Sequence, residues 1–158
     1  MSKSAPEPVN PSDFEGRIAI VASKYNTTYT DALVESASAT LAKLCPAANV
    51  EVLRVPGAFE IPVVVEQLAR DIEDPPASII ALGVIIRGST AHADLIAESI
   101  THSLHRTSLD HCIPVIHEVL LVETSEQAKD RTLGDELNRG REAAEAAVDM
   151  IQVMSSIS

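Results

Sequence analysis

The sequence predicts a three-layer α/β fold built on a parallel sheet of four strands. Four short apolar runs alternate with longer segments in which apolar residues recur at helical spacing. Two of these runs, residues 18–22 and 79–86, are continuous and rich in Ile, as in strands that are covered on both faces. Because strands and helices alternate along the chain, we expect parallel neighbours joined by right-handed crossovers.

Each element is placed by its residue pattern. The strands are expected at residues 18–22, 50–55, 79–86 and 114–122. The first three helices are expected from apolar stripes formed by Leu33, Ala37, Leu41 and Leu44, by Val65, Leu68 and Ile72, and by Ala93, Ala97, Ile100 and Leu104. Pro62 suits the first position of the second helix. After the fourth strand, residues 124–127 resemble a capping box that opens a short helix, and Gly134 separates it from a final helix. The inward positions of that final helix are Ala144, Val148 and Ile151.

Length and composition limit the kind of protein. The 158 residues suit one domain, which we assign to residues 17–158. Residues 1–16 are rich in Pro and Ser and predict a flexible tail rather than a signal peptide or membrane span. The formal net charge of −11 argues against nucleic acid or a membrane surface as a partner, so an anionic ligand needs a local cationic site. Cys45 and Cys112 have no metal-type spacing, which indicates a reduced, cytoplasmic setting.

The segment after the third strand carries the clearest chemical signal. Residues 87–90, Arg-Gly-Ser-Thr, follow the strand directly, and His92 falls in the first turn of the next helix. Ligands of open parallel sheets collect beyond the carboxyl ends of the strands, where helix N-termini present free N–H groups. There the hydroxyl groups can hold an anion, and the imidazole can move a proton near neutral pH. The alternatives are a His92 ring bonded only to a neighbour and an exposed salt bridge at Asp94.

Two other strand ends carry candidate ligand contacts. Tyr25 follows the first strand and either stacks on a planar ring or is an ordinary loop tyrosine. After the second strand, Gly57 permits a close approach of the backbone. Glu60 precedes a helix, where its carboxylate either caps the helix or binds a substrate.

The remaining histidines and Arg131 have plainer interpretations. His102 and His105 are three residues apart on a helix, but no further ligand completes a metal site, so a solvated face is favoured. His117 lies within the fourth strand, where a core or interface position is expected. Arg131 lies beyond that strand and either forms a surface ion pair or provides the cation for a phosphate.

Taken in order, these motifs resemble one known family. Residues 23–26 (SKYN), 55–62 (VPGAFEIP), 81–92 (ALGVIIRGSTAH) and 126–131 (EQAKDR) are similar to the successive motifs of the lumazine synthases of riboflavin biosynthesis. The resemblance covers residues 18–150. It implies a flavodoxin-like sandwich around a four-stranded parallel sheet. It also implies a homopentamer, which in some members assembles further into an icosahedral shell.

The resemblance further implies an activity and residue roles. The family condenses 5-amino-6-(D-ribitylamino)uracil with 3,4-dihydroxy-2-butanone 4-phosphate at a site between adjacent subunits, releasing phosphate and water without cofactor or metal. His92 would donate and accept protons, and Arg131 would bind the phosphate from a subunit-interface position. Tyr25 would stack on the pyrimidine. The other implied substrate contacts are Ala58, Phe59, Glu60, Val84, Ile85, Ile86, Ser89, Thr90 and His117.

Three positions depart from the family pattern, and two other functions stay open. His117 stands where the family usually has an aromatic residue, and Asp135 stands where a lysine is common. Arg139 keeps a cation where another lysine is frequent. One alternative is a lumazine- or flavin-binding protein without turnover. The other is an archaeal-type riboflavin synthase, although its substrate carries no phosphate and the phosphate-site residues are present here.

Overall fold

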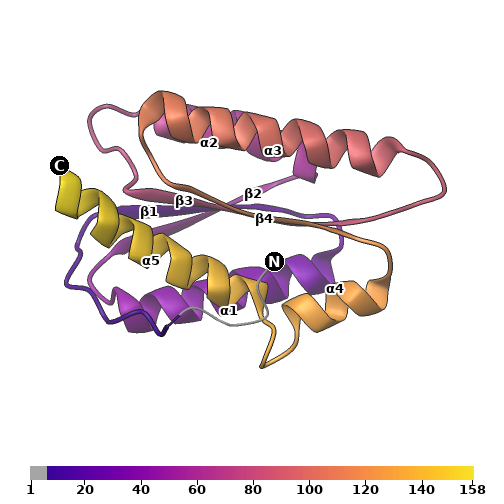
Figure 1. Cartoon of the computed structure of the whole chain (residues 1–158), viewed down its shortest axis with the longest axis horizontal. Coiled ribbons are helices and arrows are strands. Elements are labelled where there is room, and N and C mark those ends of the chain that lie inside the picture. The colour runs from indigo at the N-terminus through magenta and orange to yellow at the C-terminus, as the bar shows by residue number, and fades with distance from the viewer. Residues whose placement is uncertain (1–6) are drawn as a thin grey trace.

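The structure, a computed structural model that describes residues 7–158, contains one parallel sheet with the strand order β2-β1-β3-β4 (Figure 1). The strands are β1 (Arg17–Ser23), β2 (Asn49–Val55), β3 (Ser78–Ile86) and β4 (Val115–Val122). The helices are α1 (Thr27–Leu44), α2 (Ile61–Ala69), α3 (His92–His111), α4 (Ser125–Thr132) and α5 (Arg139–Ile157), and a 3-10 turn, η1 (Ala58–Glu60), precedes α2. The predicted α/β fold, a flavodoxin-like three-layer sandwich, is confirmed.

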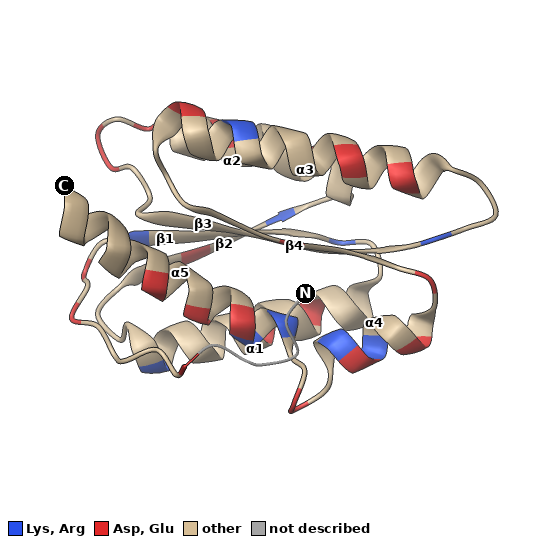
Figure 2. Cartoon of the chain, in the orientation of Figure 1, with Lys and Arg blue, Asp and Glu red and all other residues tan. Residues whose placement is uncertain are grey.

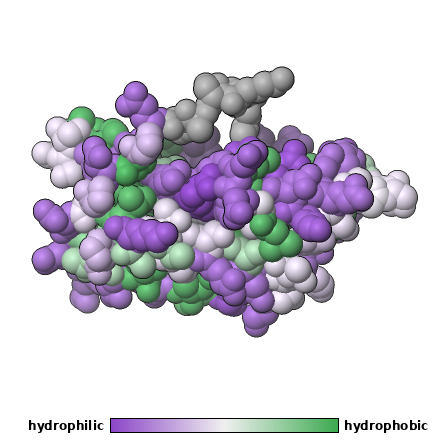
Figure 3. All heavy atoms as spheres, turned by 90° about the horizontal axis from the view of Figure 1, so that it is seen from below, coloured by the Kyte–Doolittle hydropathy of each residue, from purple (hydrophilic) through white to green (hydrophobic). Residues whose placement is uncertain are grey.

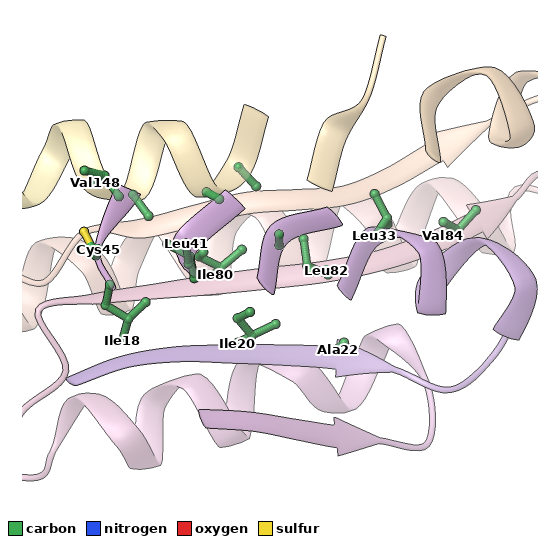
Figure 4. Packing of buried hydrophobic residues seen from close by; sticks show 14 of the residues in the cluster. Ile18, Ile20, Ala22, Leu33, Leu41, Cys45, Ile80, Leu82, Val84 and Val148 are labelled. Carbon is green, nitrogen blue, oxygen red and sulfur yellow. The ribbon is translucent and has the colours of Figure 1, made fainter. Parts of the chain in front are cut away.

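Helices cover both faces of the sheet. Helices α1, α4 and α5 lie on one face, and α2 and α3 lie on the other (Figure 1). Along β1, Ile18 and Ile20 point into the first layer of core, whereas Ala19 and Val21 point into the second. Figure 4 shows the first of these layers, in which side chains of β1 and β3 pack against α1 and α5. The central strands β1 and β3 are therefore buried on both sides, as their continuous apolar sequences predict.

The second helix differs from the prediction at both ends. Pro62 is its second residue, because the helix begins at Ile61 directly after the 3-10 turn. The helix ends at Ala69, so Ile72 does not continue the apolar stripe and is 92% exposed. The chain turns away because the Asp71 carboxylate accepts the N–H groups of the next residues, including Asp74 at 3.2 Å. These bonds and an ion pair with Arg17 lower the pKa of Asp71.

Residues 7–16 contain neither helix nor strand and run along the first core layer. The N–H of Ser12 donates to the carbonyl of Leu44 at 2.6 Å, and the amide of Gln152 donates to the carbonyl of Asn10 at 3.4 Å. Phe14 packs, half-buried, against the core. The rest of the predicted tail, residues 1–6, lies outside the described residues.

The surface is mostly polar and carries many acidic groups. Figure 2 shows Asp and Glu along α3 and α5, with basic and acidic residues mixed on α4. On the face seen in Figure 3, hydrophilic side chains predominate and apolar patches are separate. Among residues 7–158, no helix combines the length and apolar character needed to cross a bilayer.

Candidate functional site

The loops that follow β1, β2 and β3 meet at one edge of the sheet (Figure 1). The N–H of Tyr25 donates to the carbonyl of Pro56 at 3.3 Å, which joins the first two loops. The side-chain amide of Asn26 donates to the carbonyl of Val84 at 2.7 Å, which joins the first loop to β3. The polar segments expected beyond the strand ends therefore lie side by side, as a parallel sheet requires.

Asn26 is a structural residue of this edge that the sequence analysis missed. Its backbone is left-handed, with φ of 57°, and its carbonyl accepts the N–H of Thr30 at the start of α1. Asn adopts this conformation more readily than most residues, which explains its place between a strand and a helix. The sequence signal was present, because an Asn directly between a strand and a helix is a typical candidate for this role.

Two aromatic rings project from the first two loops. Tyr25 is 72% exposed and Phe59 is 60% exposed. A Cβ atom at Gly57 would lie 3.3 Å from Cδ2 of the Tyr25 ring, so the glycine lets the ring lie against the second loop. Exposed rings held at a loop junction offer flat apolar surfaces to a planar ligand.

Glu60 caps the 3-10 turn and not, as one expectation had it, the helix α2 that it precedes, which has no side-chain cap. Its Oε2 accepts the N–H of Gly57 at 2.8 Å and closes the 3-10 turn. The side chain itself remains exposed, whereas Ala58 in the same turn is half-buried. The carboxylate is therefore fixed beside the exposed Phe59 ring at the edge of the sheet.

The end of β3 is open toward β1. Pairing with β1 stops at Leu82, opposite Ala22, whereas pairing with β4 continues to Ile86, opposite Val122. Val84 is buried, and its carbonyl accepts the bond from Asn26 described above. Ile85 and Ile86 are half-buried. This stretch of backbone, expected to read the pyrimidine edge, thus extends beyond its neighbour β1 toward the site.

The loop from β3 to α3 extends outward from the edge of the sheet (Figure 1). Ser89, Thr90 and His92 are all exposed. The backbone N–H of His92 lies 3.4 Å from the Thr90 hydroxyl, a weak contact. Across residues 7–158 no hydrogen bond involves the His92 ring, so the ring is free to meet a ligand.

Arg87 lies at the base of this loop, and its role was not predicted. Its guanidinium Nη2 is 2.7 Å from Oδ1 of Asp94, and its Nε is 3.1 Å from Oε1 of Glu123. The salt bridge named as one alternative for Asp94 is therefore present. Two carboxylates neutralise Arg87, which leaves little positive charge for an anionic ligand.

Arg131 and His92 lie on opposite faces of the sheet of one chain. His92 begins α3, whereas Arg131 lies in α4, on the face that α1 and α5 also cover. The guanidinium of Arg131 donates to the carbonyl of Gln127, one turn earlier in the same helix, at 3.3 Å. Within the described part of the chain, no carboxylate forms an ion pair with Arg131. One chain therefore does not bring these two predicted site residues together.

The ring of His117 is held in one neutral tautomer. Nδ1 accepts the N–H of Val119 at 3.2 Å, and Nε2 is 2.8 Å from the Thr101 hydroxyl. That hydroxyl donates to the carbonyl of Ala97 at 2.8 Å, so it accepts from His117, whose proton must lie on Nε2. Burial lowers the pKa of His117. The imidazole therefore presents an uncharged, fixed ring between β4 and α3.

Glu118, the next residue in β4, faces α5 and was also missed. Burial, together with the charge of Glu142, raises the pKa of Glu118 to about 7, while Arg139 acts in the opposite direction. Nη1 of Arg139 is 2.8 Å from Oε2 of Glu142. Asp135 is exposed, and its carbonyl accepts a bond from Arg141 at 2.6 Å. Glu118, Arg139 and Glu142 come together only because β4 packs against α5, which the sequence pattern does not show.

Neither a metal site nor the hollow in the surface marks this edge of the sheet. Among residues 7–158, no group of three His, Cys, Asp or Glu side chains is placed to hold a metal ion. The Nε2 of His102 is 3.8 Å from Glu98 on an exposed helix face. An open hollow of about 1210 Å³ lies at the opposite end of the sheet, where Phe14, Ile72 and Met154 line it.

Comparison with known proteins identifies the family. The profile of the family described as 6,7-dimethyl-8-ribityllumazine synthase matches residues 15–155. A protein of that name from Stenotrophomonas maltophilia (strain R551-3) is 42% identical over 142 residues, which cover 89% of this chain and 90% of that protein. Another from Mycobacterium sp. (strain KMS) is 44% identical over 137 residues, with coverages of 84% and 81%. A third, from Halorhodospira halophila (strain DSM 244 / SL1), is 37% identical over 144 residues, with coverages of 90% and 91%. The resemblance of the motifs is confirmed, and the chain belongs to the 6,7-dimethyl-8-ribityllumazine synthase family.

Proposed function

We propose that this chain condenses 5-amino-6-(D-ribitylamino)uracil with 3,4-dihydroxy-2-butanone 4-phosphate to 6,7-dimethyl-8-ribityllumazine, in riboflavin biosynthesis. The observation that carries the proposal is that one end of the sheet holds two exposed aromatic rings, two exposed hydroxyl groups and a His92 ring with no hydrogen bond to residues 7–158. Two of the relatives named above bear the name of this activity, and the alignment with this chain covers 90% and 91% of their length.

The first two loops suit the flat pyrimidine. Tyr25 provides a ring face for stacking, and Phe59 adds a second apolar surface. Glu60 and Ala58 lie next to Phe59 in the 3-10 turn, where they would contact the ribityl chain. The open backbone from Val84 to Ile86 would bond the polar edge of the base. His117, neutral and fixed, would cover a base with its ring in place of the usual aromatic residue.

The third loop suits the phosphate but lacks a cation of its own. Ser89 and Thr90 provide hydroxyl and N–H groups beside His92. Arg87 is neutralised by two carboxylates, so it does not supply the missing charge. Arg131 has no ion-pair partner in the described chain, yet it lies on the other face of the sheet. Both facts support a site in which Arg131 of a neighbouring copy completes the phosphate pocket.

The reaction then requires proton transfer at one place and charge stabilisation at another. The primary amine of the pyrimidine attacks the ketone, and loss of water gives an imine. Loss of a proton and elimination of phosphate leave an enol, which takes up a proton at its terminal carbon and becomes a ketone. The ribitylamino nitrogen attacks that ketone and closes the ring with loss of water. His92 would move the protons in these steps, since an imidazole ring can both accept and donate a proton, and Arg131 would stabilise the departing phosphate. Holding both substrates together in one site between two copies of the chain would contribute much of the rate acceleration.

The same arrangement supports a homo-oligomer. Because His92 and Arg131 of one chain face different sides, a ring of copies related head to tail would build one complete site at each contact. We propose a homopentamer. Light scattering or native mass measurement would show whether pentamers assemble further into a shell. The steps are additions, eliminations and proton transfers, so the proposed reaction calls for no redox cofactor. We place it in the cytoplasm, where free thiols such as Cys45 and Cys112 persist.

The proposal is tested by following the yellow-green, fluorescent lumazine after both substrates are mixed with the protein. We expect His92→Ala to lower kcat by about 10²–10⁴-fold, the range of a lost general acid–base group. Arg131→Ala should abolish productive binding of the phosphorylated substrate. His102→Ala, which removes an exposed histidine of the same helix, is the matched control and should behave as the unaltered protein. Tight binding of riboflavin without any product from the unaltered protein would contradict the proposal.

A further inference from the structure

Arg87 joins three segments at the site edge. Its backbone N–H donates to the carbonyl of Val122, the last residue of β4, at 2.8 Å. Its guanidinium pairs with Asp94, in the first turn of α3, at 2.7 Å and with Glu123, just beyond β4, at 3.1 Å. The guanidinium is the more buried partner, since the Arg87 side chain is 35% exposed whereas Asp94 and Glu123 are 44% and 60% exposed. The contact of Nε with Glu123 is an ion pair without hydrogen-bond geometry. One residue thus links the ends of two strands to the start of the helix that carries His92.

Little else holds the loop that Arg87 precedes. A Cβ atom at Gly88 would have no heavy atom within 4 Å, and residues 88–91 are all exposed. Helix α3 has no side-chain cap at its first residue, because Ala91 occupies the capping position. Within the loop, the weak contact at 3.4 Å between the His92 N–H and the Thr90 hydroxyl is the internal bond found among the described residues.

The other end of the network is anchored. The N–H of Glu123 donates to Oε1 of Gln127 at 2.8 Å, and the N–H of Gln127 donates to the Thr124 hydroxyl at 3.2 Å. These bonds fix Glu123 to the capped start of α4. The guanidinium therefore connects a loosely held loop to a well-bonded helix start.

We propose that Arg87 is a positioning residue that holds Ser89, Thr90 and His92 in the geometry that the condensation requires. It acts through Asp94 and Glu123 and does not itself bind the phosphate, because its charge is already matched by two carboxylates. This inference rests on the proposed function, since it concerns the same site.

Arg87→Gln tests the inference, with the unaltered protein assayed in parallel on both substrates. We expect kcat/KM to fall by about 10- to 100-fold, the order of effect that small misplacements of reacting groups produce. The loss should divide between a raised KM for the phosphorylated substrate and a lowered kcat, while the KM of the pyrimidine stays constant. A merely structural role would lower the active fraction and leave both KM values unchanged. Arg87→Lys keeps the charge and should recover part of the loss.

A double-mutant cycle separates this network from general destabilisation. Asp94→Asn alone should also raise the KM of the phosphorylated substrate, and adding it to Arg87→Gln should cost no further activity, because both variants break one network. Arg106→Gln is the matched control. It breaks an exposed ion pair with Asp110, 3.2 Å apart at the far end of the same helix, and should leave the kinetics unchanged.

The possible outcomes distinguish the two claims. If the unaltered protein makes product and Arg87→Gln has the same kinetic constants, the inference is overturned while the proposed function stands. Losses that add fully in the double variant would also overturn it, since the two residues would then act independently. If the unaltered protein makes no product, the proposed function and this inference fall together.

Discussion

Replacing Gly140 with alanine tests how closely α5 packs on α1. A Cβ atom at position 140 would overlap the carbonyl oxygen of Leu33 and lie 3.0 Å from both Cα of Leu33 and Cβ of Ser36. These are backbone atoms and a Cβ, so no flexible side chain can move aside, and the helices must separate. No glycine of the described chain has a positive φ, so alanine meets no backbone strain, and the effect measures packing.

The expected magnitude follows from two opposing contributions. Alanine favours a helix over glycine by at most about 1 kcal/mol, and less in a first turn. Overpacking costs about 1–3 kcal/mol, and more where backbone must shift. We therefore expect Gly140→Ala to lose about 1–3 kcal/mol of unfolding free energy, which corresponds to roughly 3–10 °C in Tm for a chain of this size.

Urea and thermal unfolding at one fixed protomer concentration give the measurement, because assembly makes Tm depend on concentration. Gly88→Ala is the control, since a Cβ there meets open space, and its stability should match the unaltered protein. A Tm for Gly140→Ala equal to or above that of the unaltered protein would refute the packing described here.

Three further predictions concern titrating groups. Hydrogen bonds, first from Thr107, lower the pKa of Glu66 to about 2, so we expect Glu66→Gln to cost about 1–2 kcal/mol at pH 7 in urea unfolding. That difference should vanish as the pH falls from about 4.5 toward 2, and a constant difference would be contradictory. Burial raises the pKa of Glu118 to about 7, so the stability of the unaltered protein falls as the pH rises from 4.5 through 7. Glu118→Gln should therefore stabilise at pH 8 by about 1–2 kcal/mol and not at pH 4.5, and equal effects at both would count against the burial argument. Burial lowers the pKa of His117, so His117→Phe should remove a loss of stability that the unaltered protein shows as the pH falls below 6.5. The lost hydrogen bonds of the ring to Thr101 and Val119 should cost about 1 kcal/mol at neutral pH. If the two proteins had the same dependence of stability on pH, protonation of His117 would not be the cause of the loss.

The strands and most helices could be predicted because local pattern and tertiary role agree there. The apolar run before Arg87 is buried on both faces, and the stripes of α1 and α5 face the core as expected. The prediction that Ile72 continues the apolar stripe of α2 was wrong. The helix ends before Ile72 because Asp71, paired with the distant Arg17, forms a turn there. A repeating apolar spacing carries no information about such a partner.

The sequence names candidate site residues, whose roles stay predictions, but it does not give their arrangement. Its loops gather because the strands are parallel, and that follows from the alternation of elements. The separation of His92 from Arg131 depends on which helix covers which face, and the sequence pattern leaves that open. Arg87 was missed because its partner Glu123 comes from another strand end. The bond from the Gly57 N–H to Glu60 depends on the turn geometry, which the sequence pattern does not give.

The measurement that tests the central claim most directly is product formation by mixed assemblies of two inactive variants. His92→Ala and Arg131→Ala are combined by unfolding and refolding together in equal amounts, and each is refolded alone as a control. If each site takes His92 from one copy and Arg131 from its neighbour, random mixing in a head-to-tail ring restores about a quarter of the sites. We predict that share of the unaltered activity. Mixed assemblies that stay as inactive as either variant alone would contradict a site shared between copies.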